Sequence, residues 1–417
     1  MKPTVIDLFA GCGGLGLGLE QAGFETIFVN ELHQDALSTY LLNRSDTSLK
    51  ERQNHSNDIL EITQQGAELD ALANRLHREH GDVTLVAGGP PCQGYSGIGH
   101  RRSFVVTKDE IPSNHLYREM AKVVERVAPK AFLFENVKGL LSARWTPGGD
   151  RGEIWEDVQA AFRKLRVVRD GVELHYQLGW KLISAKDYGV PQNRPRVLLV
   201  GVRSDLPFSP VLSKAAGGLL PESVGAAPDP IDFLGDLVDP QWRPGGSTTQ
   251  YLVPARTAAQ RLMRTLPTGE LLAKGATLTE HEYGKHAPHI LAKFEYMLRH
   301  NGEIPAEMQT KKFAQRVIPD RWGPGGPNIT ATSLADDYVH FSQPRVPTVR
   351  EWARIQTFPD WYEFAGKRTT GGRRRAGDPS IGDWTREVPK YTQIGNAVPV
   401  ALGRTVGEHI LKVVGER

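Results

Sequence analysis

The chain has 417 residues, of which 39% are hydrophobic and 24% are charged, a composition typical of an ordinary folded protein with room for two lobes. No stretch approaches the roughly 18 consecutive apolar residues of a membrane helix, and the first residues lead into a strand-like segment without a signal sequence, so a cytoplasmic location is expected. Two cysteines argue against a disulfide framework or a thiolate zinc site, no metal site is expected, and the net charge of +3 permits a nucleic-acid partner without requiring one.

The first two hundred residues predict strands that alternate with amphipathic helices. The predicted strands are residues 4–9, 25–30, 83–87, 131–134 and 196–202. The predicted helices are residues 15–22, a segment that ends at residue 40, and residues 64–80, 115–127 and 155–165. Because such alternation is typical of a parallel sheet covered by helices on both faces, we predict an α/β fold.

The composition of the chain changes after Ser204. Proline and glycine become frequent, as in the segments DPQWRPGGS and RWGPGGPN, and the alternation of strands and helices stops. We therefore predict a second, smaller and irregular domain over residues 205–340. Regular structure returns with the helix-like segment TVREWARIQ and with a helix from about Val400, so residues 341–417 are predicted to rejoin the domain of residues 1–204.

A glycine-rich turn follows the first predicted strand, in the segment Asp7–Gly16. Glycines let the backbone approach a ligand closely, and the free N–H groups of a helix start favour a polar or anionic group. Glu31 ends the second strand, where an acid can hydrogen-bond a ribose diol, and Asp58 stands where the exit of a third strand would meet an adenine amino group. The spacing is compatible with NAD or with S-adenosylmethionine, and the departure of the turn from G-x-G-x-x-G favours the methyl donor.

Cys92 lies in the segment GGPPCQGYS, which follows the predicted strand VTLVA and so reaches the sheet edge where α/β proteins bind ligands. Pro90 and Pro91 stiffen the chain before the cysteine, and small residues follow it. A nucleophilic cysteine needs a fixed backbone and partial exposure. A buried structural cysteine is the common alternative, and the neighbouring prolines and glycines favour the nucleophile. Cys12 has no such setting and is interpreted as a turn residue.

Six segments, taken in chain order, resemble the motifs of the DNA cytosine-5 methyltransferase family over nearly the whole chain. They are an FxGxG motif at residues 7–16, a PCQ motif at 88–96, an ENV motif at 134–137, a QxRxR motif at 190–196, an RExxRxQxFP motif at 350–360 and a GNxVP motif at 393–399. Leu32 departs from the family pattern, which often has an aromatic residue there. The resemblance implies a Rossmann-like, S-adenosylmethionine-dependent methyltransferase sheet with a smaller target-recognition domain at residues 205–340.

The resemblance also implies a covalent mechanism, because C5 of cytosine is a poor nucleophile until another group adds at C6. Cys92 would add as the thiolate, and Glu135, with a raised pKa, would protonate or hydrogen-bond N3. Arg196, with Arg194 helping, would contact the cytosine O2 or hold Glu135. Asn136 is expected to fix the active-site loop. The base that removes the C5 proton is not assigned.

The donor implied by the resemblance is S-adenosylmethionine, with S-adenosylhomocysteine as its product. The donor-binding residues it assigns are Asp7, Phe9, Gly11, Gly13, Gly14, Leu15, Glu31, Asp58, Ile59, Pro90, Asn396 and Val398. The target base must be flipped out of a duplex, and residues 93–108 resemble the mobile catalytic loop that closes on the DNA. The DNA-binding residues expected are Gln93, Ser96, His100, Arg101, Arg102, Arg243 and Arg321.

The favoured interpretation is a modification enzyme that acts as a monomer on double-stranded DNA, with a cognate restriction endonuclease acting separately. A tRNA cytosine-5 methyltransferase shares the motif pattern, but Gln93 and the long variable lobe favour DNA. A DNA-binding regulator without activity is disfavoured by the intact Cys92 and Glu135. An NAD-linked oxidoreductase would leave the PPCQ and QxRxR segments unexplained.

Overall fold

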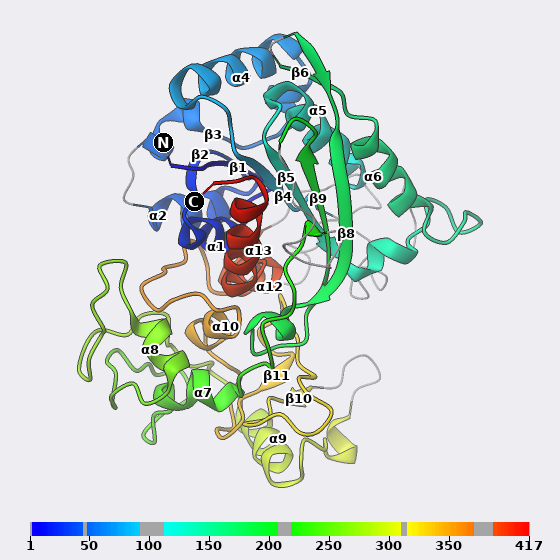
Figure 1. Ribbon diagram of the computed structural model, residues 1–417. Helices are drawn as coiled ribbons and strands as arrows, with labels where there is room; N and C mark the ends of the chain where they lie inside the picture. The colour runs from blue at the N-terminus through cyan, green and yellow to red at the C-terminus, as the bar shows by residue number, and fades with distance from the viewer. Residues whose placement is uncertain are drawn as a thin grey trace.

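The computed structural model describes residues 2–44, 48–91, 112–169, 171–206, 218–309, 315–370 and 387–416. Its centre is a seven-stranded sheet (Figure 1). In spatial order the strands are β3 (His55–Ser56), β2 (Glu25–Asn30), β1 (Thr4–Leu8), β4 (Leu85–Gly88), β5 (Ala131–Val137), β9 (Pro195–Arg203) and β8 (Tyr176–Ser184). The central strands are nearly continuous apolar runs, as expected of strands that are buried on both faces.

The prediction of a parallel sheet holds for five strands and is wrong for β9. β3, β2, β1, β4 and β5 pair in parallel, whereas β9 pairs antiparallel with both β5 and β8. The physical reason is the connection between β8 and β9, which is too short to hold a helical crossover and so returns the chain in the opposite direction. β8 and the small hairpin of β6 (Val167–Arg169) and β7 (Val172–Leu174) are strands that the sequence analysis does not predict.

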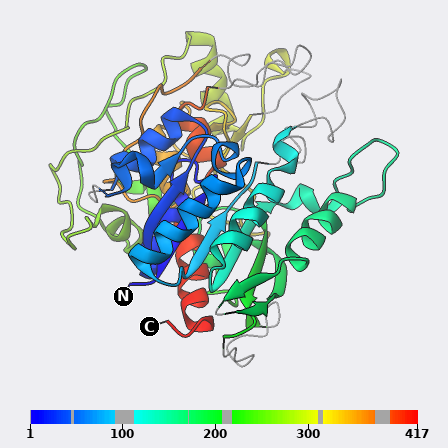
Figure 2. The ribbon, with the colours of Figure 1, turned by 90° about the horizontal axis from the view of Figure 1, so that it is seen from above.

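Two helical layers cover the sheet (Figure 1 and Figure 2). One face carries α3 (Leu60–Thr63), α4 (Gly66–His80), α5 (Tyr117–Val127) and α6 (Glu153–Arg163), and the other carries α1 (Gly14–Ala22) and α13 (Val400–Val413). Strand side chains alternate between the two cores, because Ile6 and Phe132 pack with the first layer, whereas Val5 and Leu133 pack with the second. Both views place the two ends of the chain side by side. Among the described helices, none has the length and apolar character needed to cross a membrane.

Residues 230–309 and 315–345 contain little regular structure and lie below the sheet in Figure 1. Their elements are α7 (Pro230–Leu234), α8 (Ala258–Arg264), α9 (Pro288–Arg299), β10 (Arg316–Val317) and β11 (Tyr338–Val339). One apolar cluster joins Phe233 and Met263 of this irregular region to Trp352 and Tyr391 of the returning chain. The division into domains after residues 204 and 340 stays a prediction, because a single core runs across the second boundary.

The returning chain forms α10 (Val349–Ile355) and α12 (Lys390–Asn396) before α13. α10 begins with a capping box, in which the Thr348 side chain accepts from the Glu351 N–H and the Glu351 carboxylate accepts from the Thr348 N–H. All seven residues of α10 are buried. This helix is therefore enclosed between the sheet domain and the irregular region.

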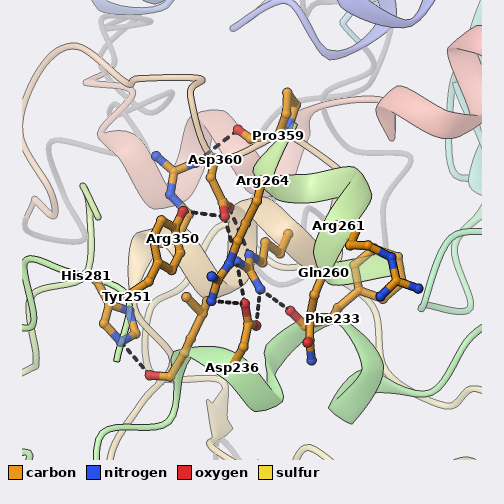
Figure 3. Close-up of polar contacts among 12 residues, drawn as sticks. Phe233, Asp236, Tyr251, Gln260, Arg261, Arg264, His281, Arg350, Pro359 and Asp360 are labelled. Atoms are coloured by element: carbon orange, nitrogen blue, oxygen red, sulfur yellow. Dashed lines mark hydrogen bonds and ion pairs between the residues drawn. The ribbon is translucent and has the colours of Figure 1, made fainter. Parts of the chain in front are cut away.

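Arg354 of α10 belongs to a buried ion cluster. Figure 3 labels Asp236, Arg264 and Asp360 of this cluster. Its guanidinium lies 2.5 Å from the Asp236 carboxylate and 2.6 Å from that of Asp360. Arg264 of α8 contacts the same Asp236 at 2.5 Å, and the Tyr251 hydroxyl donates to Asp360 at 2.6 Å. Buried ion pairs demand a matching geometry and add little net stability. The cluster therefore fixes how the irregular region sits against α10.

Candidate active site

The turn between β1 and α1 forms a bare backbone surface. Phe9, Gly11 and Gly13 have positive φ values of 54°, 57° and 87°. A Cβ on Gly14 would lie 2.2 Å from the Val398 carbonyl oxygen, so the turn packs directly on the segment between α12 and α13. A Cβ on Gly11 would meet nothing within 4 Å. The predicted donor-binding turn is therefore closed behind Gly14 and open at Gly11.

Glu31 follows β2 and reaches across to this turn. One carboxylate oxygen accepts a hydrogen bond from the Gly11 N–H at 2.9 Å, and the other accepts from the His33 N–H at 2.8 Å. Burial raises the pKa of Glu31. Each carboxylate oxygen has a further lone pair, so a ribose hydroxyl can still be bound. Leu32, next in the chain, is 58% exposed and leaves an apolar side chain beside the acid.

Asp58 lies at the end of the neighbouring strand β3. Its side chain is half-buried and accepts a hydrogen bond from the Leu60 N–H at 2.9 Å, which starts α3. The Asn30 side chain donates to the Ser56 hydroxyl and the Asn57 carbonyl, both at 2.9 Å, and so ties the ends of β2 and β3 together. Because β1, β2 and β3 are adjacent and parallel, Gly11, Glu31 and Asp58 share one sheet edge.

The C-terminal segment completes the donor region, together with the glycine turn, Glu31 and Asp58. Asn396 ends α12 and is exposed, and Val398 is half-buried beside the turn. Leu15 and Ile59 are buried beneath the edge as supporting residues. An open glycine turn, two acids on adjacent strands and an exposed amide fit a ligand with a ribose, an amine-bearing ring and an anionic group.

Asp7 of β1 is buried directly behind the turn. One carboxyl oxygen accepts from the Tyr40 hydroxyl at 3.1 Å, and the other has no hydrogen-bond partner among the residues that the structure describes. Burial, the largest cause, raises the pKa of Asp7 to about 7, although the Arg44 charge and the Tyr40 hydroxyl oppose it. The donor-contact role assigned to Asp7 stays a prediction, and its observed contacts lie behind the turn.

Asp7→Asn should change how stability depends on pH. Between the ordinary aspartate pKa and the folded value near 7, the folded chain holds a proton that the unfolded chain has lost. The contribution of Asp7 to the free energy of unfolding must therefore fall as the pH rises, by about 2–3 kcal/mol between pH 5 and pH 8. Urea unfolding at both pH values should show a fall smaller by this amount in the variant. An equal fall in the two proteins would contradict the buried, protonated Asp7.

The second half of the site lies at the ends of β4 and β5. A Cβ on Gly89 would lie 2.8 Å from a carboxylate oxygen of Glu135, so the segment after β4 runs directly beside this acid. The Asn136 side chain donates to the Pro90 carbonyl at 3.1 Å, a contact that favours the predicted role of Asn136 in fixing the loop. Cys92 itself lies outside the described residues. Gly89 thus lies beside the Glu135 carboxyl, and the Pro90 carbonyl is held by Asn136.

Glu135 and Arg196 meet across the β5–β9 pair. Val137 stands opposite Arg196 in the ladder, so Glu135 is its diagonal neighbour on the same face. The Arg196 Nε lies 2.6 Å from a carboxylate oxygen of Glu135, in a close ion pair rather than an aligned hydrogen bond, since that buried oxygen has no hydrogen-bond partner among the described residues. Burial raises the pKa of Glu135 against the opposing charges of Arg196 and Arg194. The acid can therefore hold a proton and offer it to a ligand.

The Arg194 guanidinium binds backbone carbonyl oxygens rather than the Glu135 carboxylate. It donates to the Ala331 carbonyl at 2.9 Å and to the Gly395 carbonyl at 2.6 Å. Burial lowers the pKa of Arg194. These contacts join the QxRxR segment to the end of the irregular region and to α12. The catalytic assignment of Arg194 stays a prediction, and the contacts favour a positioning role.

The DNA-binding predictions divide into two groups. Arg243 and Arg321 are exposed, as a contact with a polyanion requires. The others lie outside the described residues: Gln93, Ser96, His100, Arg101 and Arg102. Their roles stay predictions.

Gln192 is a site residue that the sequence analysis does not single out. It is fully buried, donates to the Ile355 carbonyl at 2.9 Å and accepts from the Ala331 N–H at 2.8 Å. Its position in the QxRxR motif is the sequence signal that could have identified Gln192. It links the segment that carries Arg196 to α10.

Comparison with known proteins gives one consistent result. A family model described as C-5 cytosine-specific DNA methylase matches residues 3–412. The chain is 30% identical to the Type II methyltransferase M.DdeI of Desulfomicrobium norvegicum, over 98% of this chain and 88% of that protein. It is also 30% identical to the Type II methyltransferase M.AgeI of Thalassovita gelatinovora, over 97% of this chain and 98% of that protein. A crystal structure described as a DNA modification methyltransferase encoded within an E. coli prophage has the same fold, with a TM-score of 0.65 at 20% identity over 99% of this chain and 100% of that one.

Proposed function

The chain belongs to the C-5 cytosine-specific DNA methylase family, and from this membership we propose how its residues methylate C5 of a cytosine within a specific double-stranded DNA sequence. The enzyme is of the Type II restriction-modification kind, as its relatives are. The observation that carries the site assignment is the buried Glu135–Arg196 pair beside the backbone that leads to Cys92. An acid and a cation beside the segment that leads to the proposed nucleophile support this assignment.

The proposed reaction begins with a cytosine flipped out of the duplex. The Cys92 thiolate adds to C6, while protonated Glu135 donates to N3, so the ring gains electron density at C5 without a full negative charge. Arg196 keeps Glu135 in place and contacts the base through its remaining N–H groups. After methylation a base removes the C5 proton, and the Cys92 sulfur leaves as the C5–C6 double bond forms again.

S-adenosylmethionine supplies the methyl group when it is bound, and S-adenosylhomocysteine is the product. Glu31 would hold the ribose and Asp58 the adenine amino group, both from the ends of adjacent strands. The Gly11–Gly14 turn and Asn396 would hold the amino-acid part. The open space in front of Gly11 and the exposed Asn396 side chain support this fit.

The DNA partner is proposed to contact the irregular region, where Arg243 and Arg321 are exposed. Specificity there would come from side chains that reach base edges in the major groove. We propose that the protein acts as a monomer in the cytoplasm, at the nucleoid that holds its substrate. A cognate restriction endonuclease would act separately on the same sequence.

Transfer of a labelled methyl group tests this function. The full chain is incubated with tritiated S-adenosylmethionine and either bacterial duplex DNA or tRNA. Label should enter duplex DNA alone, and bisulfite sequencing should then place it on cytosines within one short sequence. Label in tRNA alone would overturn the DNA assignment and establish the RNA alternative.

A further inference from the structure

Two tyrosines pack against the rear of the glycine turn. A Cβ on Gly13 would lie 2.7 Å from the Tyr362 hydroxyl and 2.9 Å from the Tyr40 ring, so only bare backbone fits between them. Tyr40 belongs to α2 (Gln34–Leu42), and Tyr362 comes from the returning chain after α10. Both side chains are fully buried. The proposed donor site is therefore supported from behind by two distant parts of the chain.

Tyr362 fixes one peptide group of the turn. Its hydroxyl donates to the Cys12 carbonyl at 2.6 Å, while the N–H of Gly13 donates to the Ala10 carbonyl at 3.0 Å. The peptide between Cys12 and Gly13 is thus held at both its oxygen and its nitrogen. Burial raises the pKa of Tyr362, so the hydroxyl keeps its proton and remains a donor.

Arg44 holds the two tyrosines in place. Its Nη1 donates to the Tyr40 carbonyl at 2.7 Å and to the Tyr362 hydroxyl at 3.4 Å. The guanidinium carbon lies 3.4 Å from the centre of the Tyr40 ring, and Nε pairs with Glu20 of α1 at 2.8 Å. One buried chain of contacts therefore connects α1, α2 and Tyr362.

The contacts of Tyr362 and Arg44 hold the backbone immediately before the start of α1. The helix begins at Gly14, so the N–H groups of its first turn have no acceptor within the helix, and Gly13 has no side chain to cap them. The direction in which these N–H groups point depends on the Gly13 backbone. Gly13 is joined to Cys12 by the peptide group that Tyr362 holds. The carboxylate is the one anionic group of S-adenosylmethionine, and a helix start favours an anion.

We propose that Tyr362 is a positioning residue for donor binding: by holding the Cys12 carbonyl, its hydroxyl aims the first N–H groups of α1 at the donor carboxylate. This inference rests on the proposed function, because it takes S-adenosylmethionine as the ligand of the turn. Tyr362 touches neither the donor nor the target base in this role. Its effect passes through the backbone of Cys12 and Gly13.

Tyr362→Phe tests the proposal through donor affinity measured without turnover. Titration calorimetry of the full chain with S-adenosylmethionine, in the absence of DNA, should show a Kd about tenfold higher, because the Cys12 carbonyl loses its partner. The kcat at saturating donor and the affinity for duplex DNA should stay at the wild-type values. A rise in the KM for the donor without a fall in kcat is a signature that a general loss of structure would not give.

Tyr176→Phe is the matched control. Its hydroxyl is also buried and donates to a backbone carbonyl, that of Pro129, at 2.8 Å. It belongs to β8, the sheet edge opposite β3. This variant should lower the melting temperature to a similar degree while the donor Kd stays unchanged.

The outcomes separate the proposal from its premise. Wild-type donor affinity in Tyr362→Phe would overturn the role of this tyrosine. If Tyr362→Phe does not fold, Arg44→Lys is the substitute test, because lysine keeps the charge but loses the Nη1 contact. Unchanged donor affinity in Arg44→Lys would also overturn the proposal. Failure of the wild-type chain to bind S-adenosylmethionine would instead overturn the proposed function together with this inference.

Discussion

Cys92→Ser should reduce methyl transfer by at least about 10,000-fold, because serine cannot supply a comparable nucleophile for cytosine C6. Binding of S-adenosylmethionine and of duplex DNA should remain, since neither depends on the sulfur. The measurement is incorporation of tritiated methyl into duplex DNA, with donor affinity measured by calorimetry on the same preparation. The backbone before Cys92 is held by Asn136 and borders Glu135, which is the structural reason to expect so large an effect.

Cys12→Ser provides the matched comparison for this prediction. Cys12 is the other cysteine of the chain and is buried, with its thiol 3.4 Å from the Gln393 carbonyl. Burial raises the pKa of Cys12, so its thiol does not form a thiolate near neutral pH. This variant should still transfer methyl groups. Turnover in Cys92→Ser together with its loss in Cys12→Ser would contradict the assignment of Cys92 as the nucleophile.

Glu135→Gln should reduce the rate by about 100- to 10,000-fold, because an amide cannot transfer a proton to N3. The pH dependence follows from the raised pKa of Glu135. The reactive form is the protonated acid, so kcat of the wild-type enzyme should fall as the pH rises through that pKa. The variant should lack this limb of the profile. Single-turnover rates across a pH series give both results.

Asp82→Asn supplies a control with a similar ion pair at the other end of the same sheet. Asp82 lies 2.7 Å from Arg203, at the end of β9 opposite to Arg196. Loss of that pair should lower the free energy of unfolding but leave kcat and its pH dependence unchanged. A wild-type pH profile in Glu135→Gln would show that the acid does not protonate the base. Equal rate losses in the two variants would show that the ion pairs serve only the fold.

Glu135 and Arg196 lie where the sequence analysis predicts them in relation to the sheet. Glu135 follows an apolar run and Arg196 begins one, so each could be assigned to a strand end, and the pairing of β5 with β9 brings them together. The glycine turn, Glu31 and Asp58 could be ordered in the same way, because parallel strands end at a common edge. Periodicity predicted the strand ends, whereas the roles of Glu135 and Arg196 followed from the resemblance of their segments to the family motifs.

Other contacts could not be predicted because they involve backbone atoms or distant residues. Arg194 donates to two carbonyl oxygens, and a carbonyl acceptor has no sequence signal. Tyr362 and Cys12 are separated by 350 positions, and nothing local marks either as a partner. The reversed direction of β9 depended on the length of the connection after β8. β8 is only partly buried, and so a search for apolar runs did not find it.

The covalent bond between Cys92 and the target base is tested most directly with a duplex that carries 5-fluorocytosine at the methylated position. Fluorine replaces the proton that must leave C5, so the sulfur cannot depart and the adduct should survive denaturation. With S-adenosylmethionine present, the wild-type protein should give a DNA-linked species whose modified peptide contains Cys92, and Cys92→Ser should give none. A stable adduct at any other residue, or methylation of natural duplex by a protein that forms no adduct, would contradict the mechanism.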